Sequence, residues 1–167
     1  MTDFRALIEA LSKAEVEFVL VGGVAATLHG SARLTQDVDV VYSRASGNLA
    51  RIVRALGPLQ PYLRGAPAGL PFHLDEQTLA AGLNFTLTTS AGDIDLLGEI
   101  AGVGNYEALV RHTIAVELFG LRCLCLDLPT LIAAKIALGR PRDLETAAEL
   151  RAILSERDQG STHPPED

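Results

Sequence analysis

The segment Val21–Tyr42, VGGVAATLHGSARLTQDVDVVY, joins two apolar runs of the chain and decides how the rest is interpreted. Residues 17–22 and 36–42 are rich in β-branched and aromatic side chains, which predicts a strand at each end of the segment. Residues 24–29 follow a glycine pair, precede a further glycine, and read as a short helix. The segment therefore predicts a strand–helix–strand unit with glycines at its first turn.

Two aspartates stand in the second of these strands, separated by one valine. Because side chains alternate along a strand, Asp37 and Asp39 share one face while Val38 and Val40 share the other. Two carboxylates about 7 Å apart along a strand can bind one or two divalent cations between them. The alternative is an ordinary solvated strand face, and for an isolated pair of this kind that alternative is the more common one.

A second aspartate pair reduces the weight of the solvated-face alternative. Residues 83–89 and 93–97 alternate in polarity around an Ala-Gly turn, which predicts a hairpin whose second arm contains Asp93 and Asp95. Asp95 lies deeper in its strand, whereas Asp93 follows a glycine and reads as a turn residue. If the strand of Asp95 pairs with that of Asp37, three carboxylates meet, and they repel one another unless a cation lies between them.

The remaining segments predict helices and a second hairpin around this unit. Residues 57–71 are rich in Gly, Pro and Ala and read as a loop. Together the segments predict an α/β (α+β) fold in which helices pack on a mixed β-sheet. The predicted helices are residues 2–14, 46–56 with Ser46 as N-cap, 106–112, 129–138, and 143–157 with Asp143 as N-cap; the second hairpin joins 114–118 to 121–126.

Length and composition fit one folded domain. The chain has 167 residues, 48% hydrophobic and 21% charged, so we expect a single domain over residues 1–157, with C-terminal helices from about residue 129. The polar, Pro-rich residues 158–167 read as a disordered tail. The net charge of −7 argues against broad binding to nucleic acid. No apolar run is long enough to span a bilayer, so no membrane association is expected.

The cysteines point to a reducing compartment. Cys123 and Cys125 stand two apart on a predicted strand, which places them poorly for a disulfide, and two cysteines alone are too few for a zinc site. The N-terminal segment has none of the features of a signal peptide. A reduced, cytoplasmic protein is the economical interpretation.

The glycine pair Gly22-Gly23 lies where the first strand turns into a helix. Glycines at such a turn let a ligand approach the backbone and leave helix N–H groups free for a phosphate, although an ordinary tight turn is the alternative. The chain has neither the G-x-x-x-x-G-K-[ST] phosphate loop nor the G-x-G-x-x-G dinucleotide pattern. Any phosphate would therefore be bound in a different kind of site.

The order of these motifs resembles the nucleotidyltransferase fold of the DNA polymerase β superfamily, which has a glycine pair, a spacer, D-h-D-h and a third acid downstream. The finer pattern G-x-x-R-x-T-x-D-h-D resembles the AbiEii-like minimal nucleotidyltransferases, as does a lysine in a late helix followed by basic residues and an aspartate. The resemblance covers residues 18–95 and 128–150. The residues that carry it are Gly22, Gly23, Gly30, Arg33, Thr35, Asp37, Asp39, Asp95, Lys135, Arg140, Arg142 and Asp143.

This resemblance implies transfer of a nucleoside monophosphate from an NTP to an acceptor hydroxyl, with release of pyrophosphate. It implies that Asp37, Asp39 and Asp95 are the catalytic and metal-binding residues, with two Mg²⁺ ions, or Mn²⁺ in their place. It also implies a nucleotide-binding set made of Gly22, Gly23, Arg33, Thr35 and Lys135. For Arg140 and Arg142 a solvated or capping role is the expectation from the sequence.

Two positions depart from the pattern of the relatives. Many relatives have a serine that can bond a phosphate where this chain has Gly23, which offers only its N–H group. Their last helix often carries a further acid where this chain has Thr146. The three aspartates are themselves intact.

The sequence leaves the acceptor open among tRNA, a protein and a small molecule. Acceptor specificity would come from residues 57–74, from the C-terminal helices, or from a second copy or partner protein. The leading interpretation is an active enzyme, with a role in a toxin–antitoxin system. The alternatives are a non-catalytic NTP-binding antitoxin or regulatory module of the same fold, and an enzyme that adenylylates an antibiotic.

Overall fold

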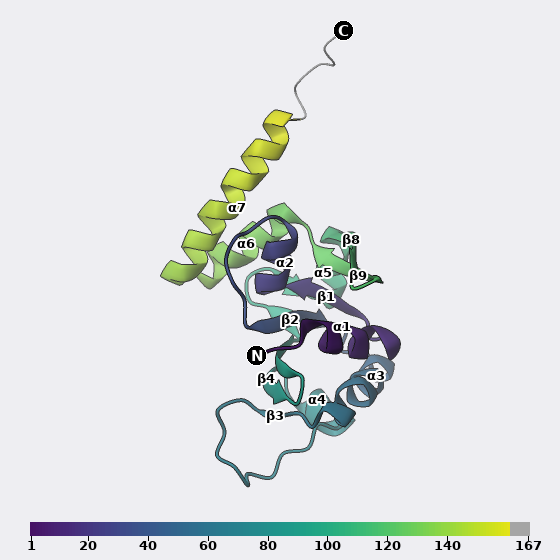
Figure 1. Ribbon diagram of the computed structural model, residues 1–167. Coiled ribbons are helices and arrows are strands. Elements are labelled where there is room, and N and C mark those ends of the chain that lie inside the picture. Colours follow the sequence, from purple (N-terminus) through teal and green to yellow (C-terminus); the bar gives the residue numbers. More distant parts are fainter. Residues whose placement is uncertain (161–167) are drawn as a thin grey trace.

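The computed structural model describes residues 1–160, and their arrangement is built around one large mixed sheet (Figure 1). Its strand order is β3-β4-β5-β2-β1-β9-β8. Strand β2 runs parallel to β5 and antiparallel to β1, and β1 runs parallel to β9. The seven strands are β1 (Phe18–Val21), β2 (Asp37–Tyr42), β3 (Tyr62–Leu63), β4 (Asn84–Thr89), β5 (Gly92–Leu97), β8 (Thr113–Leu118) and β9 (Leu121–Leu126).

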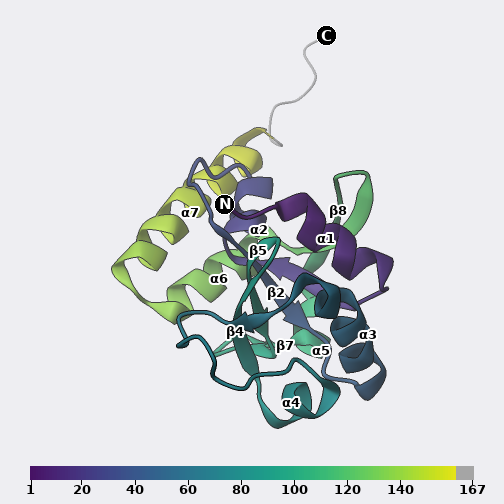
Figure 2. The same cartoon turned by 60° about the horizontal axis from the view of Figure 1, so that its bottom comes forward.

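Helices cover both faces of the sheet (Figure 2). On one face lie α1 (Phe4–Lys13) and α3 (Ser46–Leu56), with α4 (Glu76–Ala81) beside α3. On the other lie α6 (Leu128–Leu138) and α7 (Pro141–Gly160). The smaller elements are α2 (Gly22–Leu28), α5 (Tyr106–Leu109), the hairpin β6 (Glu99–Ile100) with β7 (Gly104–Asn105), and 3₁₀ turns at Gly57–Leu59 and Val110–His112.

The hydrophobic core fills the space between the sheet and α1 and α3. Val38, Val40, Ile94 and Leu96 point to this side and are fully buried, together with three residues of α1: Leu7, Ile8 and Leu11. Burial of this many apolar side chains is the main contribution to the stability of the fold. The strand alternation that buries the valines of β2 necessarily turns its aspartates to the opposite face.

The sequence predicted the mixed sheet, the two strands joined by the segment Val21–Tyr42 and both long hairpins correctly. It missed α4, the short strand β3, and the β6–β7 hairpin. Strand β3 lies inside the segment expected to be a loop and pairs with β4, so the chain returns to the sheet there. A two-residue strand carries too little alternation to be recognised from its side chains.

Both predicted N-cap residues lie inside their helices. Ser46 is the first residue of α3, and the N-cap is Ala45, whose side chain accepts no hydrogen bond. Helix α7 begins at Pro141, which suits the first turn because proline has no N–H to satisfy there. Asp143 therefore lies inside the first turn of α7 and was wrongly predicted as an N-cap.

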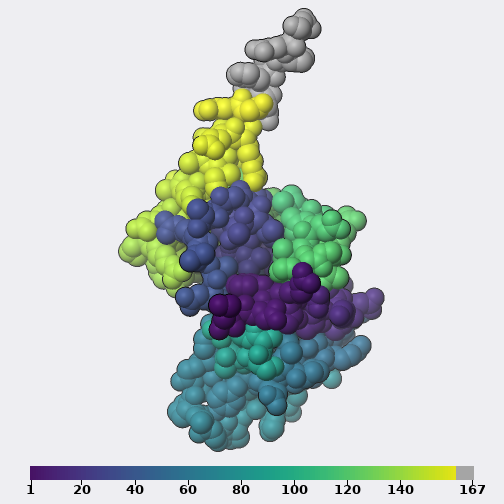
Figure 3. Space-filling view, in the orientation of Figure 1, coloured from purple at the N-terminus to yellow at the C-terminus, as the bar shows by residue number. Residues whose placement is uncertain are grey.

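Helix α7 also runs further than expected. It continues through Gly160, beyond the predicted end at residue 157 and into the segment predicted as a tail. Figure 3 shows its last turns, in yellow, standing clear of the rest of the molecule. The remaining tail, residues 161–167, lies outside the described residues.

Two further expectations concern the cysteines and the membrane. Cys123 and Cys125 are free and buried on β9, where burial raises the pKa of both thiols, that of Cys125 to about 12. Both therefore remain neutral thiols packed in the core. No helix within residues 1–160 has the length and apolar character needed to cross a bilayer.

Candidate active site

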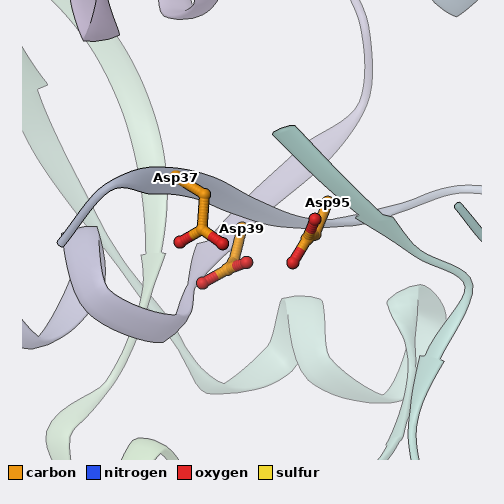
Figure 4. Close-up of side chains that lie close together, drawn as sticks. All are labelled: Asp37, Asp39 and Asp95. Atoms are coloured by element: carbon orange, nitrogen blue, oxygen red, sulfur yellow. The ribbon is translucent and has the colours of Figure 1, made fainter. Parts of the chain in front are cut away.

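The parallel pairing of β2 with β5 sets the geometry of the acidic site. Asp37 is opposite Asp93, and Asp39 is opposite Asp95, so four carboxylates form a two-by-two array on one face of the sheet. Asp37, Asp39 and Asp95 each offer an oxygen within 4.8 Å of the other two. Figure 4 shows these three side chains pointing to the same side from two neighbouring strands. Asp93 was expected to be a turn residue, but it lies within β5 on the acidic face.

Asp39 is the carboxylate most affected by its surroundings. Burial, followed by the charges of Asp37 and Asp95, raises its pKa from 3.8 to about 8, although Lys135 acts in the opposite direction. Burial and the charge of Asp95 also raise the pKa of Asp37, against the lowering effect of Arg64. Carboxylates this close cannot all ionise comfortably unless positive charge is brought between them.

The glycine pair packs directly against the acidic strand and forms the first turn of α2. Gly22 has a φ of +65°, and a Cβ atom there would lie 2.7 Å from Cγ of Asp39. Both facts require glycine, since other residues rarely adopt this φ and their Cβ atom would collide with Asp39. A Cβ at Gly23 would lie 2.6 Å from Cβ of Thr35. The side chain of Thr35 therefore fills the space that the serine of many relatives would occupy.

A cavity of about 340 Å³ opens on the acidic face between β2, the segment before it, and helices α6 and α7. Its acidic wall contains Asp37, Asp39 and Asp95. A second cavity, of about 290 Å³, lies on the other side of Asp39, Asp95, Lys135 and Arg140 and is lined mainly by apolar side chains. The first cavity is also lined by cationic residues and by residues expected to bind the nucleotide: Gly23, Arg33, Thr35, Lys135, Arg140 and Arg142.

Three charged residues at the α6–α7 junction form a network on the wall facing the aspartates. Arg140 donates from Nε to Oδ2 of Asp143 at 2.6 Å, and Nζ of Lys135 lies 3.8 Å from Oδ1 of the same carboxylate. Asp143 is 3% exposed. Burial alone would raise its pKa, but the hydrogen bond and charge of Arg140, with the charge of Lys135, hold that pKa below its usual value. The ionised carboxylate thus holds Lys135 beside the cavity.

Arg33 has other partners in this structure. Its guanidinium lies 3.6 Å from Glu145 and 3.8 Å from Glu149 of α7, so it lines the cavity while pairing with carboxylates. Ser31 also donates to Glu149, at 2.5 Å. Figure 3 shows the segment that follows α2, in dark blue, lying against α7. A phosphate would therefore compete with two glutamates for Arg33.

Arg64 was not predicted to lie at the site, and the structure places it there. It directly follows β3, and its guanidinium approaches three of the four carboxylates: Nη2 lies 2.9 Å from Asp95, Nε 3.4 Å from Asp93, and Nη1 3.7 Å from Asp37. Arginine in a Gly/Pro-rich stretch was the only sequence signal for it. That signal is weak because it does not show where this segment rejoins the sheet.

The residues present suit a divalent cation. Three carboxylates supply hard oxygen ligands of the kind that Mg²⁺ and Mn²⁺ bind. Within residues 1–160, Oδ1 of Asp95 is among the few buried side-chain atoms that lack a hydrogen bond, although an ion pair with Arg64 reaches it. Asp37, Asp39 and Asp95 would hold the ion.

A mixed sheet that brings three carboxylates together beside a glycine turn defines a nucleotidyltransferase fold, and comparison with known proteins agrees. The sequence pattern of the AbiEii nucleotidyl transferase toxin family, described as a type IV toxin–antitoxin system, matches residues 5–144. The chain belongs to this family. None of the curated proteins matches the sequence.

A solved structure with a TM-score above 0.5 supports the fold. A candidate nucleotidyltransferase from Thermotoga maritima is 19% identical, with 91% of this chain and 90% of that chain covered and a TM-score of 0.55. The antibiotic-resistance factor ANT(2'')-Ia is 15% identical, with 95% and 92% covered and a TM-score of 0.49. At this identity, the first likeness establishes a shared fold and nothing finer.

Proposed function

We propose that this protein transfers a nucleoside monophosphate from an NTP to an acceptor hydroxyl and releases pyrophosphate. The observation that carries the proposal is the convergence of Asp37, Asp39 and Asp95, whose oxygens lie within 4.8 Å of one another at the wall of a cavity with cationic side chains opposite. In the transfer, the acceptor oxygen forms a bond to the α-phosphorus while the bond from this phosphorus to the β-phosphate oxygen breaks. The acceptor proton is lost, and the electron pair leaves with pyrophosphate.

The side chains divide this work by position. Lys135 and the cationic residues beside it bind and orient the triphosphate, because they face the aspartates across the cavity. Asp95, which lies on the strand next to that of Asp37 and Asp39, accepts the proton of the acceptor hydroxyl. Thr35 and the N–H of Gly23 border the same cavity and contact phosphate oxygens. Mg²⁺ bound to the three aspartates, or Mn²⁺ in its place, would offset the charge of the phosphates and lower the pKa of the acceptor hydroxyl.

Family membership suggests the biological setting. The family description names a toxin of a type IV toxin–antitoxin system, so we propose a toxin-like transferase in the cytoplasm whose activity an antitoxin counteracts. The acceptor class among tRNA, protein and small molecule is left to experiment. We expect two Mg²⁺ ions, because phosphoryl transfer at such acidic sites commonly uses a pair of cations about 3.5–4 Å apart.

The test is incubation of the purified chain with each α-³²P-labelled NTP, Mg²⁺ and candidate acceptors, with label transfer and pyrophosphate as readouts. We expect transfer by the wild type and none by the Asp37→Ala/Asp39→Ala variant. Asp158→Ala, which changes an exposed aspartate of α7, is the matched control and should retain activity. Pyrophosphate release that persists in the double variant would refute the mechanism. NTP binding with no transfer to any acceptor would favour the non-catalytic antitoxin or regulatory module.

A further inference from the structure

Arg64 connects the long segment after α3 to the acidic face. It is the ion-pair partner of Asp37, Asp93 and Asp95, with nitrogen–oxygen distances of 3.7, 3.4 and 2.9 Å. Its side chain is 28% exposed, and its Nε is a buried atom without a hydrogen bond. One guanidinium thus lies among three of the four carboxylates in the array.

The position of this guanidinium is fixed by β4 as well as by the acids. The backbone N–H of Arg64 donates to the carbonyl of Thr86 at 3.0 Å, and Nη2 donates to the carbonyl of Leu87 at 2.7 Å. Both acceptors belong to the strand next to β5. These bonds hold the side chain over the outer part of the array by contacts that do not involve the aspartates.

We propose that Arg64 is a positioning residue that occupies the outer half of the acidic array and confines divalent cations to the side of Asp39. This inference rests on the proposed function, since it concerns the same metal site. With the guanidinium between Asp37, Asp93 and Asp95, the oxygens left for a cation are those that Asp37, Asp39 and Asp95 direct toward one another. Arg64 also holds Oδ1 of Asp95, which fixes the orientation of the proposed proton acceptor.

Charge and shape explain why this residue is an arginine. Lys135 acts on Asp39, and Arg64 acts on the other three acids, so the two cations offset half of the formal charge of the four carboxylates. A planar guanidinium can pair with several carboxylates from fixed directions, whereas the ammonium of a lysine is a single point charge. A lysine at position 64 would supply the charge but not the simultaneous contacts.

Metal binding separates this role from a merely structural one. We expect Arg64→Gln to bind one Mn²⁺ ion more than the wild type, counted by electron paramagnetic resonance at fixed pH, because the outer carboxylates become available. Adding Asp93→Asn to that variant should return the count to the wild-type value. Arg64→Lys should keep the wild-type count. Arg54→Gln, an exposed arginine of α3, is the matched control. An unchanged count in Arg64→Gln that is well folded by circular dichroism would overturn the proposal.

Kinetics provide the second readout. Arg64→Gln should lower kcat by about tenfold or more while the KM for the NTP changes by less than about threefold, because a misoriented Asp95 affects the reacting atoms rather than the triphosphate. Arg64→Lys should fall between the wild type and Arg64→Gln. A KM effect alone would contradict the positioning role. If the wild type transfers no nucleotide, the proposed function fails, but the difference in Mn²⁺ count still decides the role of Arg64.

Discussion

The burial of Asp39 should make the protein less stable as the pH rises, which is opposite to the effect of a carboxylate with a lowered pKa. Its pKa is raised from 3.8 to about 8, so folding at neutral pH requires this carboxyl to take up a proton that it does not hold in the unfolded chain. A group with a raised folded-state pKa contributes its stability fully below its unfolded pKa and loses it as pH rises through the folded one. The metal-free protein should therefore lose stability between about pH 4 and pH 8.

The isosteric change Asp39→Asn removes this titration. One proton changes the unfolding free energy by up to about 1.4 kcal/mol per pH unit, so at pH 7 the uptake by Asp39 opposes folding by at most about 4 kcal/mol. The amide of asparagine is neutral and offers N–H donors to Asp95, the neighbour whose charge and hydrogen bonding raise the pKa of Asp39. Even about 1 kcal/mol of this effect would raise the Tm of a chain of this size by about 2–4 °C. Asp39→Asn should thus be more stable than the wild type at pH 7 and inactive.

The assay is thermal unfolding in EDTA at several values from pH 4 to pH 8, repeated with Mg²⁺. The wild-type Tm should fall as pH rises, the Asp39→Asn curve should be flatter, and Mg²⁺ should stabilise the wild type far more than the variant. Asp158→Asn makes the same charge change on an exposed position and should leave the wild-type slope unaltered. A variant that is equally or less stable than the wild type at pH 7–8 in EDTA, or that has the same slope, refutes this account of the site.

Three substitutions test the remaining walls of the site. Gly22→Ala should lower the unfolding free energy by about 1–3 kcal/mol in chemical denaturation, because it strains a positive φ and displaces Asp39. Gly23→Ser should destabilise the protein in the same assay, and the added change Thr35→Ala should recover most of the loss by emptying the space that the serine needs. Lys135→Met should keep the fold, because the lysine side chain is only 17% exposed and methionine fills a similar buried space. The change should weaken NTP binding by about tenfold in calorimetry, because a phosphate partner is lost.

The face of the sheet that carries the acids could be predicted from sequence for a simple reason. Strand alternation is a local property, so Val38 and Val40 fix the buried side and thereby the side of Asp37 and Asp39. The partner strand and its register are not local. Parallel pairing of β2 with β5 places Asp93 opposite Asp37, whereas its position after a glycine suggested only a turn.

The contacts of Arg33 and Arg64 depend on tertiary structure in the same way. Arg33 is part of a sequence pattern that suggests phosphate binding, yet it pairs with Glu145 and Glu149, more than a hundred residues away. Arg64 follows a two-residue strand whose pairing with β4 depends on the fold of the whole hairpin. A long side chain places its charge several ångströms from the backbone. Its partners therefore belong to segments far away in the sequence, which a local sequence pattern cannot identify.

The two departures from the family pattern bear on whether the site is active or degenerate. Position 23 lacks a serine, but Thr35 fills the space where that side chain would stand, and its hydroxyl donates to the carbonyl of Asp37 at 3.1 Å. A hydroxyl thus lies at the same wall of the cavity although it comes from a different residue. A side chain at position 23 would collide with Thr35, so this wall has room for only one of the two side chains.

The second departure has a similar explanation. Thr146 is buried and donates to the carbonyl of Arg142 within α7, while the carboxylate of this region comes from Asp143, one turn earlier. Asp143 is ionised and bound to Arg140, so it holds Arg140 and Lys135 at the lining of the cavity that contains the aspartates. The further acid of the relatives is absent here, but the charged network of Asp143, Arg140 and Lys135 remains. Together with three convergent aspartates, this favours a working transferase over a binding module that has only retained the fold.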